Sequence, residues 1–475
     1  MTDLFLNYNW NSTEIYHRVT CELLKQTSID TIGATVVGRK PYKFLKEQNN
    51  INYDPLYCVQ DVHQNIVENQ YDPERISELE NRYGAPNLWP ALWADRKYIE
   101  YTPEKQKRLV QGWFDFFIEL FDSFNPDIYL TSAVDSAYTW IPFRIVNEEY
   151  GTAVQRAHTR VLDREVLQKT VAGRFNTIWD RYEKMGSDVE TVYSESYQEA
   201  TTFLRKFRKE GVTPEYTDSD SSQTGDPSKL YELVNYWYQK KLGYYNDDFY
   251  HDSTQRRIKE SVKQLLWRKY VDYRDLFQRP NYNSNYVYFP LHLQPEASTM
   301  VKAPMYVELP DVIRDLSKSL PVDYNLYVKE HPALYKYKIR RPRYYKEIDK
   351  LPNTVLIHPH VDSHELIKSS DAVTTVTGTA GLEGVFYKKP VLTFGEPNYS
   401  KLPQVYEAGD PKGLPAVLYD ALSEHRHTDE YESELIKYLT AIFHESYPSL
   451  NNKSGERLQD AIQKQCSVLE QELFR

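Results

Sequence analysis

The sequence has few of the features that mark secreted, membrane-spanning or metal-bound proteins. Its 475 residues include only three cysteines, Cys21, Cys58 and Cys466, which lie far apart and form no CxxC pair. This pattern predicts neither a disulfide framework nor a zinc site, and it favours a reducing cytoplasm. The N-terminal stretch MTDLFLNYNWNSTE lacks the basic start and long apolar run that are expected of a signal peptide. No apolar stretch is long enough to span a bilayer.

The chain also lacks a basic excess. Its net charge is −10 at pH 7, which argues against a broad nucleic-acid contact. Aromatic residues make up 14% of the sequence, and 41 residues are tyrosine. We interpret them first as core residues, although aromatic faces also stack on sugars. The length predicts two α/β domains with additional helices.

Strands alternate with helices in two regions. In the first, a helix is predicted over 102–124, with Thr102 as its cap and Pro103 in its first turn, followed by a strand over 126–131 and a helix over 140–150. In the second, strands are predicted over 286–291, 324–329, 354–357, 372–376 and 391–394. Helices over 309–320, 362–370 and 381–387 separate them. This order predicts a parallel, doubly wound sheet.

The intervening region, 152–280, has helical spacing and few strand signals. It contains a polar loop over 215–228 and helical patches over 230–242 and 253–270. We therefore interpret 1–151 as an N-terminal Rossmann-like domain, 152–280 as a helical insertion or connector, 281–425 as a C-terminal Rossmann-like domain and 426–475 as C-terminal helices.

Three polar segments follow strands of the second predicted sheet. They are His292–Thr299, which includes Gln294, then Lys329–Pro332 (KEHP), and Thr377–Glu383 (TGTAGLE). Open α/β sheets bind ligands at the carboxyl ends of their strands. The three segments therefore predict a ligand site at one sheet edge.

The turn Thr377-Gly378-Thr379-Ala380-Gly381 predicts a phosphate site. Glycine lets a backbone approach a ligand closely, and the next helix presents free N–H groups. Thr377 and Thr379 add hydroxyl groups. The alternative is a tight strand-to-helix turn with Thr379 as the helix cap.

Three charged or polar side chains extend this hypothesis. Lys329 supplies positive charge, and His331 supplies a hydrogen-bond donor for a phosphate or a nucleobase carbonyl. The alternative for His331 is a histidine that only caps the end of a strand. Glu383 can accept two ribose hydroxyls, or it can merely complement a helix N-terminus.

Two further clusters have simpler interpretations. His358, His360, Asp362 and His364 suggest a metal, but we favour a polar loop and predict no metal. Basic residues lie at Lys336, Lys338, Arg340, Arg341, Arg343 and Lys346. They form either a solvated face or a contact for anionic lipid or an acidic acceptor.

At these segments the chain resembles the capsule polysaccharide biosynthesis glycosyltransferases, which include the bacterial β-Kdo transferases. The matching stretches are YFPLHLQPEAST, KEHP and TVTGTAGLEGVFYKKPVLTFG. The resemblance covers residues 281–400 well and the N-terminal half only as a loose strand–helix pattern. It implies a GT-B architecture of two Rossmann-like domains, with the donor nucleotide on the C-terminal one and the acceptor on the N-terminal one.

The resemblance also implies a function. In related enzymes that use CMP-sugars, the His-Pro histidine contacts the nucleotide and hydroxyls of the later turn hold its phosphate, which here implicates His331, Thr377 and Thr379. We therefore expect a glycosyltransferase that moves a sugar from a nucleotide sugar, with a CMP-sugar favoured, to a surface or capsular polysaccharide or its lipid-linked acceptor. It would need no cofactor, bind no nucleic acid, and work in the cytoplasm or at the inner face of the membrane.

The sequence leaves the general base and the reaction open. Asp135, after the predicted strand 126–131, is the candidate base, although we favour a role as a helix cap. The alternative functions are a polymerase that transfers a polyol phosphate from a CDP-activated donor, a nucleotide-sugar epimerase of the same fold, and a sugar-binding subunit without activity.

Overall fold

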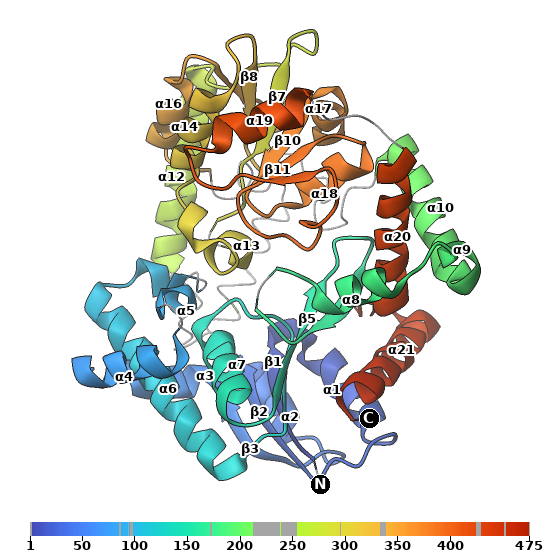
Figure 1. The fold of residues 1–475 in the computed structure, drawn as a ribbon. Coiled ribbons are helices and arrows are strands. Elements are labelled where there is room, and N and C mark those ends of the chain that lie inside the picture. Colours follow the sequence, from blue (N-terminus) through green and yellow to red (C-terminus); the bar gives the residue numbers. More distant parts are fainter. Residues whose placement is uncertain are drawn as a thin grey trace. The chain divides into compact units, whose positions relative to one another are not determined.

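The protein is described from a computed structural model. The described residues are 2–84, 87–93, 95, 98–171, 173–211, 238, 254–294, 296–332, 339–423, 429–450 and 453–474. They form two compact units, each with its own sheet (Figure 1). Unit 1 includes Met1–Val171 and Ser446–Arg475, and unit 2 includes Ala172–Ser219 and Ser253–Glu445. Within these residues no helix is long and apolar enough to cross a membrane.

The sheet of unit 1 has the strand order β13-β6-β5-β4-β1-β2-β3. Strands β3, β2, β1, β4 and β5 run parallel, and β6 and β13 are antiparallel additions. The bounds are β1 Asp3–Asn9, β2 Thr31–Val37, β3 Tyr53–Cys58, β4 Ile128–Thr131, β5 Thr152–His158, β6 Arg164–Gln168 and β13 Tyr447–Pro448.

Helices connect these strands, and one of the two predicted in this unit begins where the sequence indicated. Helix α6 has Thr102 as its N-cap and Pro103 as its first residue, and it buries the predicted stripe that includes Trp113 and Phe117. Helix α7 starts before the predicted residue 140, because Ser136 and Thr139 form a capping box. The helices of unit 1 are α1 Thr13–Leu23, α2 Arg39–Lys46, α3 Val59–Val67, α4 Pro73–Tyr83, α5 Trp89–Trp93, α6 Pro103–Phe124, α7 Ala137–Glu149 and α21 Gly455–Leu473.

The prediction that a helical connector begins at residue 152 is wrong. Residues 152–168 form β5 and β6, which extend the first sheet. Polar residues of β5 made the strand hard to detect in the sequence, because Gln155 and Arg156 are buried and contact residues outside the strand. Gln155 donates to the carbonyl of Thr170 at 2.6 Å, and the Arg156 guanidinium lies 4.1 Å from the centre of the Tyr16 ring.

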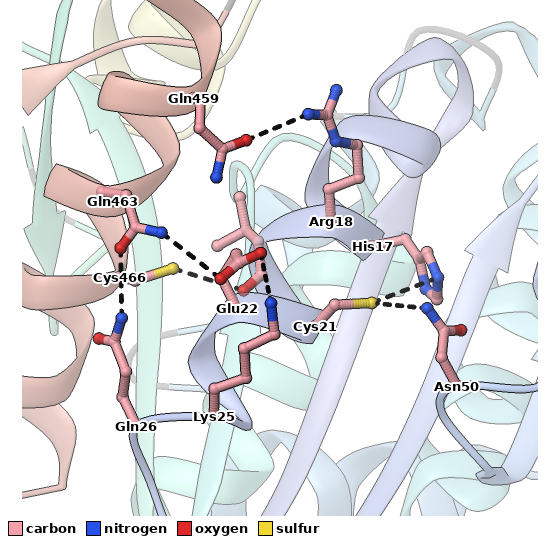
Figure 2. A network of polar contacts seen from close by, with 11 residues as sticks. His17, Arg18, Cys21, Glu22, Lys25, Gln26, Asn50, Gln459, Gln463 and Cys466 are labelled. Carbon is pink, nitrogen blue, oxygen red and sulfur yellow. Dashed lines mark hydrogen bonds and ion pairs between the residues drawn. The ribbon is translucent and has the colours of Figure 1, made fainter. Parts of the chain in front are cut away.

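The C-terminal segment is not purely helical either. Strand β13 pairs with β6, and α21 packs against α1. Figure 2 shows the polar contacts of this interface: Arg18 donates to Gln459 at 3.3 Å, and Gln463 donates to Glu22 at 3.4 Å. The Cys466 thiol donates to the carbonyl of Val19 at 3.5 Å. The end of the chain is therefore part of the N-terminal unit.

The sheet of unit 2 has the order β12-β11-β10-β7-β8-β9, and every pairing is parallel. This confirms the predicted parallel sheet, which β12 extends beyond the predicted strands. The bounds are β7 Tyr286–Pro290, β8 Asn325–Lys329, β9 Thr354–Ile357, β10 Ala372–Thr375, β11 Val391–Thr393 and β12 Val405–Glu407.

Helices cover both faces of this sheet. Val287 and Phe289 of β7 pack into one core cluster with α14 and α19. On the opposite face, the Tyr286 hydroxyl donates to the carbonyl of Leu366 in α17, and Gly384 of α18 lies against β10 and β11. The helices of unit 2 are α8 Asn176–Lys184, α9 Val189–Val192, α10 Ser194–Glu210, α12 Thr254–Tyr273, α13 Ala297–Met300, α14 Leu309–Ser319, α16 Pro342–Asp349, α17 Ser363–Ser369, α18 Thr379–Phe386, α19 Leu414–Ser423 and α20 Asp429–Glu445.

Helix α12 confirms the predicted helical patch over 253–270. The predicted loop over 215–228 lies outside the described residues, as does all of the 230–242 patch except residue 238.

Candidate functional site

The three polar segments predicted from the sequence meet at the carboxyl edge of the second sheet. They follow β7, β8 and β10, and β7 is the central strand of the three. Because the strands are parallel, their last residues reach the same edge. His331, after β8, and Thr379, after β10, therefore lie at one edge of the sheet, on either side of the loop that follows β7.

His292 in that loop connects the segments, a role that the sequence did not reveal. Its buried Nε2 accepts the backbone N–H of Val376 at 3.0 Å and lies 3.1 Å from the Thr375 hydroxyl. Burial lowers the pKa of His292 to about 3, so the ring is neutral and can act as an acceptor. A Cβ added at Gly378 would lie 2.8 Å from the His292 ring, so the turn needs glycine there.

The turn before α18 is held rigidly from both sides. The Tyr399 hydroxyl donates to the Gly378 carbonyl, and a Cβ at Gly381 would lie only 2.2 Å from that hydroxyl. The Thr377 hydroxyl donates to the Ser298 carbonyl, so its proton is directed into the protein. Sequence reasoning predicted Thr377 as a phosphate donor and did not detect this contact.

The N-terminus of α18 offers unpaired donors. Gly378 is the N-cap, which corrects the alternative reading of Thr379 as the cap. The N–H of Gly378 is bonded to the Thr375 hydroxyl at 3.0 Å. Among the described residues, the backbone N–H groups of Thr379 and Ala380 have no hydrogen-bond acceptor. Backbone N–H groups without an acceptor at the positive end of a helix are a common arrangement for binding an anion.

Lys329 and Glu383 form the charged part of the site. The side chain of Lys329 is only 3% exposed, and its Nζ donates to the Ser363 hydroxyl at 2.6 Å. Burial lowers the pKa of Lys329 to about 8, against the opposing attraction of Asp362 and Glu383. Burial raises the pKa of Glu383 to about 7, against the attraction of Lys329. Among the described residues Glu383 has no hydrogen-bond partner, which leaves its carboxylate available to a ligand.

A buried ion pair supports the segment that carries His331. The carboxylate of Glu330, with no exposed surface, accepts from Arg340 Nε at 2.9 Å, from the Tyr345 hydroxyl at 2.7 Å and from the His331 N–H at 2.7 Å. Arg340 also donates to Gln294 at 3.3 Å and to the carbonyl of His292.

Arg340 is therefore a structural residue of the site, which corrects its assignment to a solvated basic run. Gln294 in turn donates to the Val307 carbonyl at 2.8 Å, so this predicted ligand residue is engaged within the protein. Burial lowers the pKa of His331, with opposition from Glu330. Near pH 7 the His331 ring is neutral and has one N–H to donate.

The remaining predicted residues lie elsewhere. Asp135 follows β4 of unit 1, and its backbone N–H donates to the Thr139 hydroxyl at 3.2 Å. Because Ser136 is the N-cap of α7, the interpretation of Asp135 as the cap is wrong.

The histidine-rich segment after β9 contributes packing contacts. His364 Nδ1 lies 3.1 Å from the Tyr387 hydroxyl, and the His358 and His360 rings are 5.0 Å apart. Within the part of the chain that is described, no three His, Cys, Asp or Glu side chains come together as metal ligands. Lys336 and Lys338 are outside that part.

The fold is a Rossmann-like α/β sheet, and Lys329, His331 and the N-terminus of α18 lie at the carboxyl ends of its strands. Residues 188–402 match the family described as capsule polysaccharide biosynthesis protein. All three polar segments lie inside the match, which begins well before the stretch that carried the resemblance. Over this segment, which is less than half of the chain, the sequence is similar to that family. No curated protein matches the sequence.

Solved structures show a distant likeness. The β-Kdo 2,7 transferase KpsC of Thermosulfurimonas dismutans is 12% identical with a TM-score of 0.38, over 84% of this chain and 97% of that one. The UDP-GlcNAc 2-epimerase of Neisseria meningitidis, bound to UDP-GlcNAc, is 12% identical with a TM-score of 0.29, over 99% and 100% of the chains. Because both TM-scores are below 0.5, the similarity to the capsule family rests on the sequence match alone.

Proposed function

We propose that this chain is a glycosyltransferase that moves a sugar from a nucleotide-sugar donor onto a surface polysaccharide or its lipid-linked precursor. The observation that carries the proposal is the meeting of Lys329, His331 and the open N-terminus of α18 at one sheet edge. These groups lie within the segment that matches the capsule biosynthesis family.

The site can stabilise a departing phosphate by charge. As the bond between sugar and phosphate breaks, negative charge grows on the phosphate oxygens. The N–H groups of Thr379 and Ala380, the Lys329 ammonium and the His331 N–H can then neutralise this charge, with no metal in the step. The carboxylate of Glu383 can accept ribose hydroxyls, while the ion pair of Glu330 and Arg340 fixes the backbone that positions His331.

The nucleotide is proposed to be CMP, and a thermal-shift panel tests this. CMP, CDP, UDP and GDP should be compared at equal concentration, because a ligand that binds only the folded state raises the melting temperature. At a concentration 100 times its Kd, a bound nucleotide adds about 2.7 kcal/mol of stability. A shift with UDP or GDP and none with CMP would redirect the donor assignment, and no shift with any nucleotide would contradict the proposed site.

Replacing the site histidine tests catalysis. His331→Ala should lower donor-dependent transfer by roughly a hundred- to a thousandfold, because it removes a donor that acts on the leaving group. Folding should be preserved. His444→Ala, an exposed histidine at the end of α20, is the matched control and should keep full activity. A folded and fully active His331→Ala enzyme would remove His331 from the mechanism.

The acceptor separates the proposed activity from its rivals. A nucleotide-sugar epimerase converts its substrate without an acceptor, a polyol phosphate polymerase leaves phosphate in its product, and a binding subunit does not turn over. Product analysis with and without a glycan acceptor therefore decides among them. Transfer of sugar that requires the acceptor is the expected result.

We also propose that the transferase meets its lipid-linked acceptor at an anionic membrane surface. Helix α12 exposes Val262, Leu265 and Leu266, which are 50–60% exposed and share one face. Lysine and arginine residues flank this face, and α16 adds Lys346, whose Nζ lies 5.0 Å from the centre of the Tyr270 ring. Basic helices with an apolar face bind anionic lipid surfaces.

Vesicle sedimentation tests this contact. The protein should co-sediment with vesicles of phosphatidylglycerol and phosphatidylcholine, and less with phosphatidylcholine alone. Leu266→Glu should weaken the contact, whereas the exposed residue Tyr419 provides Tyr419→Glu as the matched control. Equal sedimentation of both variants would contradict a role for α12.

A further inference from the structure

Unit 1 contains a cavity of about 660 Å³ beside its edge strand, a size typical of ligand pockets. The cavity is bounded by the end of β3, by α3 and by α6. Strand β2 separates β3 from the central strands β1 and β4. The cavity is therefore distinct from the loop after β4 that holds Asp135, and it belongs to a different unit from the phosphate site.

An aromatic pair forms the apolar wall of this cavity. Tyr57 at the end of β3 and Phe116 of α6 pack edge to face, with ring centres 5.2 Å apart. Tyr57 is 38% exposed, so its ring remains available to a ligand. A flat, partly exposed aromatic ring stacks on the apolar C–H face of a sugar ring while the sugar hydroxyls point elsewhere.

Groups that bind hydroxyls surround the aromatic pair. Asn65, Asn69, Gln70 and Gln111 contribute amides, Asp61, Asp115 and Glu119 contribute carboxylates, and Arg108 contributes a guanidinium. The Nε of Arg108 is buried and has no hydrogen-bond partner, although a buried donor of this kind normally has one. Amides, carboxylates and guanidinium groups can each bind two neighbouring hydroxyls of a sugar.

The polar wall is positioned before any ligand arrives. Arg75 of α4 donates to Asp115 from Nε at 3.0 Å, and Gln111 donates to the same carboxylate at 3.3 Å. Gly112 allows α6 to approach α3, since a Cβ there would lie 2.2 Å from Ile66. Side chains fixed in this way lose little entropy when a ligand binds.

We infer that this cavity is a binding site for a neutral saccharide. The charges of the wall balance, because Asp61 pairs with Arg39 at 2.8 Å and Asp115 pairs with Arg75 at 2.9 Å. The remaining lining charges, on Glu119 and Arg108, are opposite, so the cavity has no positive excess that would favour a phosphate or an acidic sugar. The aromatic wall and the amides suit a neutral sugar ring. Given the proposed function, on which this role rests, the bound segment is part of the glycan acceptor.

Direct binding tests the inference without reference to turnover. Saturation-transfer NMR on the full chain should use maltotriose and chitotriose as neutral probes and sialyllactose as the acidic probe. At least one neutral probe should bind at or below about 10 mM, and sialyllactose should bind more weakly. Binding of neither neutral probe, or stronger binding of sialyllactose, would overturn the inference.

Substitutions then locate the bound probe. Tyr57→Ala should weaken neutral-probe binding by about tenfold, and Gln111→Ala should also weaken it. Tyr419→Ala, an exposed tyrosine on α19 of the other unit, is the matched control and should leave binding unchanged. Binding that survives in both cavity variants would place the saccharide elsewhere and refute the site.

Nucleotide binding keeps the two proposals separable. Tyr57→Ala should keep the thermal shift with nucleotide, and His331→Ala should keep saccharide binding. Failure of saccharide binding with an intact nucleotide shift overturns this inference alone. If no nucleotide raises the melting temperature of the unsubstituted protein, the proposed function is overturned. The saccharide site is then tested by the saccharide-binding data alone.

Discussion

Breaking the buried pair of Glu330 and Arg340 should strongly destabilise unit 2. In Arg340→Met, the Glu330 carboxylate keeps the Tyr345 hydroxyl and the His331 N–H but loses its positive partner in a position with no exposed surface. Removing one member of a buried ion pair typically costs about 3–5 kcal/mol, because the other charge stays buried and uncompensated. The contacts of Arg340 with His292 and Gln294 disappear as well.

The expected loss is large enough to measure by thermal unfolding. For a unit of 150–250 residues, each kcal/mol moves the melting temperature by about 2–4 °C, so Arg340→Met should lower it by roughly 6–20 °C. Arg343→Met is the matched control, because the Arg343 side chain is 88% exposed in its pair with Glu347. It should change stability by no more than about 0.5 kcal/mol.

A double-mutant cycle isolates the ion pair from these other contacts. Glu330→Gln combined with Arg340→Met removes both charges together, so the double variant should be more stable than the sum of the two single changes predicts, by about 2 kcal/mol or more. Strict additivity would refute the argument, since it would mean that neither single variant leaves an uncompensated charge.

Three further substitutions and a pH series test the site. Gly381→Ala should destabilise the turn and abolish nucleotide binding, because its Cβ would meet the Tyr399 hydroxyl at 2.2 Å. Gly413→Ala should be neutral, because its Cβ would make only ordinary van der Waals contacts, the nearest at 3.7 Å; equal melting curves for the two variants would contradict this. CMP affinity measured by calorimetry should fall as pH rises above about 8, because Lys329 then loses the proton whose charge attracts the phosphate. Lys329→Arg keeps its charge and should reduce this fall in affinity; the same pH dependence in both proteins would exclude Lys329 as its cause. Asp135→Asn should leave the cap of α7 intact, because Ser136 rather than Asp135 is the N-cap, so the variant should fold and keep transfer activity; a folded but inactive variant would instead identify Asp135 as the general base.

The second sheet follows closely from local sequence. Strand β9 spans the predicted residues 354–357, and α14 begins at the predicted Leu309. Short apolar runs, Pro310 in a first turn and Asp362 as an N-cap are local signals, and each acts within a few residues of the chain. The order of strands and helices then predicts which loops share a sheet edge, which is why the segments with Lys329, His331 and Gly378 could be grouped in advance.

Tertiary structure decided the features that depend on distant partners. In strand β5, Gln155 and Arg156 are buried against Thr170 and Tyr16. Polar residues at buried positions break the apolar pattern of a strand, so the sequence did not indicate one here. The same reason explains the return of α21 to α1, which rests on contacts between residues more than 400 positions apart.

At the sheet edge, too, some features could be predicted from the sequence and others required the structure. Sequence alone predicted a site at Lys329, His331 and the glycine turn, because charge, donors and backbone freedom belong to the residues themselves. It could not show that Arg340 is buried against Glu330, that the Thr377 hydroxyl is directed to Ser298, or that His292 joins the loops. Burial, pKa and hydrogen-bond partners are set by whatever packs around a side chain, and only the folded chain brings those neighbours together.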